Sequence, residues 1–448
     1  MNAPRAQRWW WLVWVAIAIA LVGRAAGRKP EKGVLLDHLE FGRRLMHGED
    51  VYGPWRSDKD APVLPLHAPY PPSFGLLTAP FHLVDATSGL RAARTAWALL
   101  QLASLVAIAV LLRRLSTPRA PPLPEPTERR WPWLWLLTFL ATMRFVLRDT
   151  HGGGGNLINV ALALLALHAS ERGRDRAAGA WLAFSLVTKP TMVWLLPVFA
   201  LFGRWRTLRW TAAAGGAFVL LTMALQRFDI APWWRWLQGS LAMATMADPW
   251  AAPAFDFPPF TWMNQALRFL VARWCGSVPD EFAARVALGV WPGLGFSTTA
   301  VGWLVRGVSL LLLLAVLRTA WRARHSAEGR LATVAATLVL ALLLSPISWK
   351  GHHVALVPIV LLLLQQAWWQ GRTGLWWVLG GFVAMCVMPG GDLVGDAADE
   401  WLNSLYVVPA WDLVLLGCGL AVALRSARSS SLEHQEIALA RRHRESGR

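Results

Sequence analysis

Apolar runs separated by short polar loops recur along the whole chain. Many hold fifteen residues or more, and few contain a charge, which is typical of helices that cross a bilayer. Several are shorter than the roughly twenty residues that a straight span requires. The pattern predicts an all-α polytopic membrane protein with about twelve spans, near residues 9–23, 92–112, 131–147, 156–169, 177–188, 191–202, 210–225, 298–317, 331–347, 353–367, 375–389 and 404–424.

The stretch 177–202 decides the predicted topology. Lys189-Pro190 interrupts it, and a proline removes a helical hydrogen bond. The loops on its two sides, 172–176 and 204–209, are both basic, and basic loops tend to stay in the cytoplasm. We therefore expect two short helices that enter the membrane and return, with Lys189-Pro190 at a turn that faces the external side.

This topology divides the rest of the chain between two faces. The basic loops between spans and both termini are expected on the cytoplasmic face, together with a polar basic tail at 426–448. Two longer segments, 24–90 and 226–297, are expected on the external face, where short amphipathic helices can lie along the membrane surface. Residues 1–425 would then form a single transmembrane domain.

Composition supports a membrane protein and limits the kinds of partner and cofactor to be expected. The 448 residues are 55% hydrophobic and only 16% charged, which is less charge than a soluble protein of this size carries. A formal charge of +17 can indicate nucleic-acid binding, but the arginines lie in short loops between apolar runs, so no nucleic-acid partner is expected. The three cysteines, Cys275, Cys386 and Cys418, predict neither a disulfide framework nor a zinc site, and no cofactor is expected.

Polar groups from distant parts of the chain fall at span ends on the expected external face. Ionisable residues at membrane depth are costly and are usually functional. The polar groups of this chain on that face comprise one carboxylate base, several cations and several amides. This set suits the transfer of a group from a lipid phosphate to a hydroxyl. The candidate base is Asp37, and the candidate substrate-binding residues are Tyr70, Arg148, Asn156, Lys189, Asn264, Gln265, Trp349, Lys350, His352 and His353.

Several of these residues also have a purely structural interpretation. Lys189 can extend its side chain to the interface and only position the turn. Arg148 and Asp149 can form a local ion pair at a helix end. His352 and His353 can be an interfacial pair without a ligand, and no further metal ligands stand at a suitable spacing, so no metal site is expected.

The order of the polar motifs resembles glycosyltransferase family 87, the bacterial polyprenol-phosphate-mannose-dependent mannosyltransferases. The resemblance runs from about residue 9 to 424. The matching motifs are the early Asp37, Gly48–Tyr52, Tyr70-Pro71-Pro72, Ala79-Pro80, the glycine-rich turn before Asn156, Lys189-Pro190, Asn264–Leu267, and Ser345–Trp349 leading to His352 and His353.

The resemblance implies a GT-C-type bundle of transmembrane helices in the bacterial plasma membrane, with its active site on the external, periplasmic face. It implies inverting transfer of a hexose, in this family mannose, from a polyprenyl phosphate, with Asp37 as the base. The acceptor would be a hydroxyl of a glycolipid or glycan. Lys189 with His352 or His353 would hold the donor phosphate.

A transporter or flippase for a lipid-linked or anionic substrate is the alternative. Many spans and a proline-broken hairpin fit that class as well. Transporters tend to have paired halves with matching interrupted helices, whereas the second half of this chain has no counterpart to Lys189-Pro190. The two large segments on one face also favour an enzyme.

Overall fold

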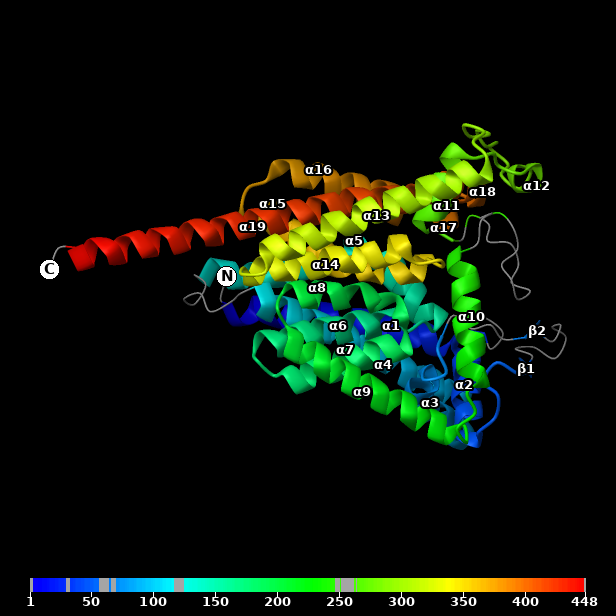
Figure 1. The fold of residues 1–448 in the computed structure, drawn as a ribbon. Coiled ribbons are helices and arrows are strands. Elements are labelled where there is room, and N and C mark those ends of the chain that lie inside the picture. Colours follow the sequence, from blue (N-terminus) through cyan, green and yellow to red (C-terminus); the bar gives the residue numbers. More distant parts are fainter. Residues whose placement is uncertain are drawn as a thin grey trace.

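Helices make up nearly the whole of this computed structural model (Figure 1). It describes residues 3–29, 33–55, 64–65, 70–116, 125–245, 250, 262 and 264–446. Within that part, the only strands are β1 (Pro54–Trp55) and β2 (Leu64–Pro65), which form a two-residue antiparallel ladder. The predicted all-α class is confirmed.

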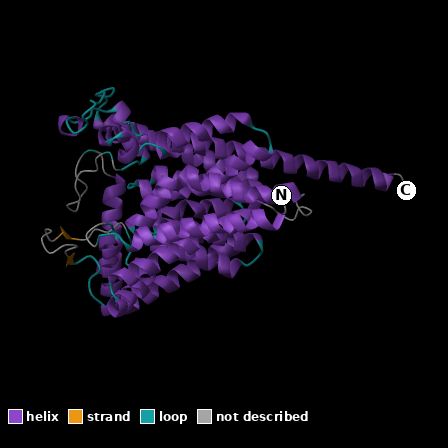
Figure 2. Cartoon of the chain, turned by 180° about the vertical axis from the view of Figure 1, so that it is seen from behind, coloured by secondary structure: helices purple, strands orange, loops and turns teal. Residues whose placement is uncertain are grey.

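The helices of the central bundle run side by side through the body of the molecule, seen from opposite sides in Figures 1 and 2. They are α1 (Ala3–Ala26), α4 (Leu90–Ser116), α5 (Glu125–Gly152), α6 (Asn156–Glu171), α7 (Asp175–Thr188), η1 (Pro190–Trp194) with α8 (Leu195–Leu201), α9 (Trp205–Leu225), α13 (Thr298–Ala323), α14 (Ala327–Leu344), η2 (Lys350–Leu356) with α15 (Val357–Trp369), α16 (Thr373–Phe382) with the π-helical turn η3 (Val383–Val387), and α19 (Val407–Ser446).

Short helices gather at one end of this bundle, on the right in Figure 1. They are α2 (Leu35–His47), α3 (Phe74–Ser88), α10 (Ala231–Thr245), α11 (Leu267–Cys275), α12 (Asp280–Ala283), α17 (Gly391–Val394) and α18 (Asp396–Ser404). Both chain ends lie toward the opposite end, where α19 projects beyond the bundle. The two segments predicted to share one face, 24–90 and 226–297, thus supply most of the short helices.

Six helices are long and apolar enough to cross a membrane: α4, α9, α13, α14, η2–α15 and the first part of α19. A seventh candidate is the pair formed by α5 and α6, which bends by 112° at its break. Each of the twelve predicted apolar runs overlaps a helix, but the remaining helices do not combine the length and the hydropathy of such a span over their described residues. The chain is thus a polytopic membrane protein, and a count of twelve spans stays a prediction.

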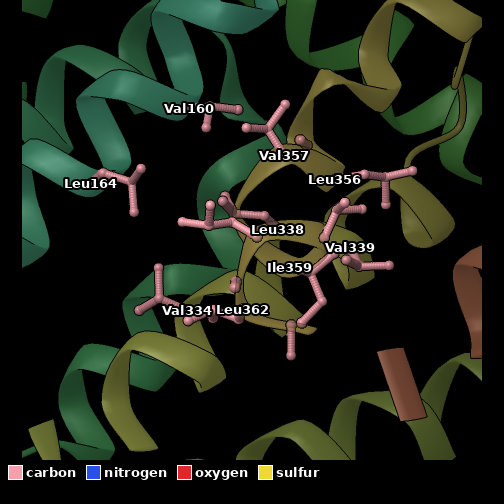
Figure 3. Close-up of a cluster of buried hydrophobic side chains, with 14 of the residues drawn as sticks. Val160, Leu164, Val334, Leu338, Val339, Leu356, Val357, Ile359 and Leu362 are labelled. Carbon is pink, nitrogen blue, oxygen red and sulfur yellow. The ribbon is translucent and has the colours of Figure 1, made fainter. Parts of the chain in front are cut away.

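The most buried of these spans are α14 and η2–α15, whereas few residues of α9 and α13 are buried. Leu338 and Val339 of α14 lie against Leu356, Ile359 and Leu362 in a cluster of fully or almost fully buried side chains (Figure 3). Lipid tails are as apolar as these side chains, so close packing holds such helices together. The two central helices therefore provide a rigid support for the short segments at their ends.

An ion-pair cluster around Glu171 confirms the hairpin. Glu171, at the end of α6, accepts from Arg204 at 3.2 Å and from the Arg330 Nε at 2.6 Å. The loops before α7, before α9 and before α14 therefore meet at one end of the bundle. The chain must leave that end along α7 and return along η1 and α8, so Lys189-Pro190 forms the turn at the opposite end, beside Asn156.

Candidate active site

Helix α2 presents Asp37 from its first turn. The helix is amphipathic, and Leu39, Phe41 and Leu45 bury its apolar face. Its backbone lies so close to α3 that a Cβ at Gly42 would come within 2.7 Å of the Ala79 nitrogen. This tight packing fixes the helix, and so the position of Asp37.

Asp37 is a half-buried carboxylate with an unusual environment. Within the described residues, no hydrogen bond or ion pair engages it. Burial raises the pKa of Asp37 from 3.8 to about 7. A base is most effective when its pKa lies near the working pH, so this carboxylate suits proton abstraction better than an ordinary surface acid.

The neighbouring acid on the same helix is already paired. Glu40 accepts from the Arg43 Nε at 2.8 Å and from the Arg44 Nε at 2.7 Å. Burial alone would raise the pKa of Glu40, but these hydrogen bonds hold it below its usual value. Glu40 therefore organises the end of α2 and is a poor candidate for the base.

A buried chain of polar groups connects α5, α6 and the hairpin turn. Asp149, almost fully buried in the last turn of α5, accepts from the Asn156 Nδ2 at 2.6 Å and from the Leu157 backbone nitrogen at 3.0 Å. Asn156 Oδ1 in turn accepts from the Lys189 Nζ. Because Asp149 holds the amide nitrogen, the amide oxygen of Asn156 faces Lys189.

The glycine-rich turn makes this arrangement possible. The chain bends sharply between α5 and α6, and Gly153 has φ of 75°, a backbone conformation that favours glycine. A Cβ at Gly154 would collide with the Asp149 carboxylate and approach the Asn156 Nδ2 within 3.2 Å. Gly154 therefore leaves the space in which Asp149 meets Asn156.

Tyr70 links Lys189 to the first turn of α2. The Lys189 Nζ lies 5.6 Å from the centre of the Tyr70 ring, which stacks on Phe74 at 4.1 Å. Burial, and then the charges of Asp149 and Asp37, raise the pKa of Tyr70 above its usual value. The charges of the two carboxylates thus act on the same aromatic side chain that the lysine contacts.

His38, next to Asp37, is fully buried against aromatic rings. It packs edge-on against Tyr70 and Phe74, with ring centres 5.3 and 4.8 Å apart. Burial, and then the charge of Lys189, lower the pKa of His38 to about 3. His38 is therefore neutral, and it packs the first turn of α2 against the rings of Tyr70 and Phe74.

His352 joins Asn156 and Lys189 around a small cavity. Ser345 and Asn159 line it as well, and its volume of about 20 Å³ leaves room for about one water molecule. The His352 Nδ1 accepts from the Trp349 backbone nitrogen at 2.8 Å. That bond fixes a neutral ring with its proton on Nε2, so His352 is available as a hydrogen-bond donor.

Asn264 and Gln265 hold the loop that carries His352. The Asn264 side chain donates to the Pro346 carbonyl and accepts from the Ser348 nitrogen, both at 2.9 Å. The Gln265 backbone nitrogen donates to the Ser348 carbonyl at 2.6 Å. Both side chains are fully buried, and that of Asn264 positions the loop, whereas that of Gln265 donates to the Trp262 and Asn403 carbonyls. Trp349, at its end, stacks near His352 with ring centres 6.2 Å apart.

Lys350 and His353 flank the cavity without lining it. Lys350 lies 3.4 Å from Asp399, which also binds Arg144 at 2.6 Å. His353 is fully buried and bridges the Trp349 carbonyl and Asp412 on α19, both at 3.0 Å. These two residues anchor η2 to α18 and α19.

Arg148, the remaining predicted residue, is exposed near the end of α5. In the part of the chain that the structure describes, its side chain makes no hydrogen bond or ion pair, so the ion pair with Asp149 considered above does not form. Asp149 itself pairs with Asn156 across the glycine turn.

Asn159 is a residue that the sequence-based prediction missed. Its Nδ2 donates to the Lys189 carbonyl at 3.3 Å. An amide inside the apolar run of α6 was the available signal for it.

Comparison with known proteins confirms the resemblance to the family. The sequence model of glycosyltransferase family 87 matches residues 68–346, more than half of the 448 residues. A relative in Mycolicibacterium smegmatis, a polyprenol-phosphate-mannose-dependent α-(1-2)-phosphatidylinositol pentamannoside mannosyltransferase, is 26% identical over 308 residues, which are 68% of this chain and 62% of the relative. The match thus spans less than two thirds of that relative. The region matched by the family model contains Tyr70, Asn156, Lys189 and Asn264. Asp37 lies outside that region. The chain belongs to glycosyltransferase family 87.

Proposed function

We propose that this glycosyltransferase moves a mannosyl group from a polyprenyl phosphate to a hydroxyl of a glycolipid or glycan, with inversion and with Asp37 as general base. The observation that carries the proposal is the unpaired Asp37 carboxylate, whose pKa lies at about 7 and whose charge acts on Tyr70, the residue that Lys189 contacts. The choice of mannose and of a lipid acceptor rests on the activity for which the Mycolicibacterium smegmatis relative is named.

The reaction step follows from these groups. The acceptor hydroxyl gives its proton to the Asp37 carboxylate while its oxygen attacks the anomeric carbon of the donor sugar. The bond between that carbon and the phosphate oxygen breaks, and polyprenyl phosphate leaves with the electron pair. Attack from the face opposite the phosphate inverts the anomeric configuration. Phosphate is a good leaving group, so one base and electrostatic stabilisation suffice.

Lys189 and His352 would hold the departing phosphate. Lys189 stands in the turn outside both helices of the hairpin, and burial lowers its pKa to about 8, so it is mostly protonated at neutral pH. Its hydrogen bond goes to the neutral Asn156 amide, which leaves the positive charge available for an anion. The Nε2–H of His352 supplies a second donor at the same cavity. Charge-assisted contacts of this kind stabilise the charge that develops as the bond breaks.

The orientation completes the proposal. We infer that residues 1–425 form one membrane domain whose basic loops and termini face the cytoplasm, and that the end bearing Asp37 faces the periplasm. The positive-inside rule supports this, because Arg204, Arg330 and their neighbours lie at the end opposite Asp37. The lipid donor would then approach the site from the outer leaflet.

The function can be tested with purified protein in lipid nanodiscs. Polyprenyl phosphates carrying labelled mannose, glucose or arabinose are supplied with extracted membrane glycolipids as acceptors, and release of polyprenyl phosphate is measured. We expect turnover with the mannosyl donor and a product of inverted anomeric configuration by NMR. Retained configuration would exclude the single-displacement step, and no turnover with any donor would contradict the assigned donor class.

A further inference from the structure

A second cavity lies on the other side of the glycine-rich turn. It is formed where the ends of α1, α4 and α5 meet the first turn of α2, and its lining includes Arg28, Arg94, His151 and Leu35. Its volume is about 10 Å³. Lys189 and His352 line the first cavity and do not reach this one. The two cavities are therefore separate features of the same end of the bundle.

Positive charge converges on this second cavity. Burial, and then the charges of Arg94, Arg148 and Arg24, lower the pKa of Arg28. Arg94 donates to the backbone carbonyls of Arg28 and Lys29, which draws the end of α1 toward α4. No described carboxylate forms an ion pair with Arg24, Arg28 or Arg148. An anion would therefore be attracted to this place.

Arg28 has a buried donor that lacks a partner. One of its terminal nitrogens donates to the His151 carbonyl, but its Nε is buried with no hydrogen-bond partner among the described atoms. Leaving a donor of a charged group unsatisfied costs more than leaving a neutral one. Guanidinium groups bind phosphate through two parallel hydrogen bonds. A phosphate oxygen at the Arg28 Nε would remove this cost.

Membrane orientation does not explain these arginines. The basic loops around Glu171 mark the opposite end of the bundle, and the positive-inside rule places the excess of arginine there. Arg24, Arg28, Arg94 and Arg148 instead cluster at the end that carries Asp37. Basic pockets between helices at headgroup level are typical sites for anionic lipid headgroups.

We propose that this pocket takes one phosphate oxygen of an anionic membrane lipid, whose phosphate group lies at the mouth of the pocket, with Arg28 as its central ligand. The site is distinct from the donor-phosphate site at Lys189 and goes beyond the transfer reaction. Leu35 lines the pocket two residues before Asp37, and the Val34 nitrogen bonds the Gly152 carbonyl at 2.9 Å. A bound phosphate would therefore tie the first turn of α2 to the ends of α1 and α5.

The proposal can be tested by native mass spectrometry on the delipidated full chain. Phosphatidylglycerol, phosphatidylcholine with the same acyl chains, and inorganic phosphate are compared. We expect one phosphatidylglycerol to bind more tightly than phosphatidylcholine, and Arg28→Gln to weaken that binding by about tenfold or more. Arg91→Gln is the matched control, because Arg91 is an exposed arginine at the same end, outside the pocket. It should bind like the unmodified chain.

Three outcomes separate the possibilities. Equal binding of the two phospholipids, or equal losses in Arg28→Gln and Arg91→Gln, would overturn the proposal. Inorganic phosphate that binds as tightly as phosphatidylglycerol would overturn the lipid assignment. If Arg28→Gln does not fold, Arg148→Gln replaces it, because the Arg148 side chain has no described partner whose loss would disturb the fold. A several-fold loss of phosphatidylglycerol affinity is then expected. Asp37→Asn should bind lipid normally, so failure of the proposed reaction would leave this test intact.

Discussion

Asp37 and Glu40 lie one turn apart on α2, yet their surroundings give them opposite properties. Arg43 and Arg44 bind Glu40 and keep it ionised. The Asp37 carboxylate is largely buried and has no described hydrogen-bond or ion-pair partner. A carboxylate in a desolvated site binds protons more tightly, because burial penalises its charge. This difference favours Asp37 over Glu40 as the proposed base.

The environment of Asp37 predicts the pH dependence of the reaction. Its pKa of about 7 lies above the usual value, so the carboxyl is protonated, and inactive as a base, below that pH. We expect kcat/KM for the acceptor to fall about tenfold for each pH unit below about 6 and to be highest between the pKa values of Asp37 and Lys189, at about pH 7.5. Initial rates at subsaturating acceptor over pH 5–8 measure this. A rate that stays constant down to pH 5 would mean that the base has an ordinary carboxyl pKa.

The two lysines near His352 should behave differently. Lys189 lines the cavity, whereas Lys350 lies beside Asp399 and outside the cavity. Loss of a charge-assisted contact of roughly 1.5–3 kcal/mol predicts that Lys189→Gln raises the donor KM about ten- to a hundredfold. Lys350→Gln, the matched control, should change it only a few-fold. Similar donor KM values in the two variants would contradict the assignment of the phosphate site.

For single residues, the sequence was a good guide to which side chains lie at the same site. It was a poorer guide to the role of each one. Asn156, Lys189 and His352 were expected at one site and line one cavity. His353 and Lys350 looked equivalent to His352 in the sequence. Their partners Asp412 and Asp399 stand more than forty residues away, so their anchoring could not be inferred without the fold.

Among the elements, the glycine-rich turn between α5 and α6 does the most to shape the site. In the sequence, the glycine run before Asn156 was one of the motifs that resemble the family. In the structure, Gly154 leaves space for the Asp149 carboxylate, and its carbonyl accepts from the Trp97 Nε1 at 3.0 Å. The turn is therefore a fixed connection that orients Asn156 toward Lys189.

Two alanine substitutions test this role of the turn. A Cβ at position 154 would displace the Asp149 carboxylate, so Gly154→Ala should raise the donor KM and lower the free energy of unfolding by about 1–3 kcal/mol. Gly155→Ala, in the same turn, would place its Cβ at an ordinary 3.5 Å from Trp97 and should be tolerated. Donor kinetics and thermal unfolding measure both effects. Equal tolerance of the two variants would show that the space at Gly154 is unimportant.

The hairpin shows where sequence patterns are most informative. Two basic loops on either side of Lys189-Pro190 predicted that the chain enters and returns, and the Glu171 ion pairs confirm that these loops meet. The number of spans could not be derived in the same way. Helices such as α7 and α8 are too short to be judged from length and composition, because packing against neighbours can hold a short helix in place.

For the whole molecule, membership of a glycosyltransferase family argues against the transporter considered from the sequence. The orientation in the membrane still needs a direct measurement. His325 is exposed in the loop before α14, and Glu281 is exposed in α12 at the other end. In a Cys275→Ala background, an impermeant maleimide should label Glu281→Cys in intact cells and leave His325→Cys unlabelled. The reverse pattern would place Asp37 in the cytoplasm.

The most direct test of the proposed mechanism is the turnover of Asp37→Asn with the mannosyl donor. The amide keeps the shape of the side chain but cannot take the proton, and it does not introduce a buried charge, so the protein should fold and bind donor normally. We expect kcat to fall about 10²–10⁴-fold, whereas Glu40→Gln on the same helix should lose far less. Near-normal kcat in Asp37→Asn, with correct folding, would contradict the role of Asp37 as the base.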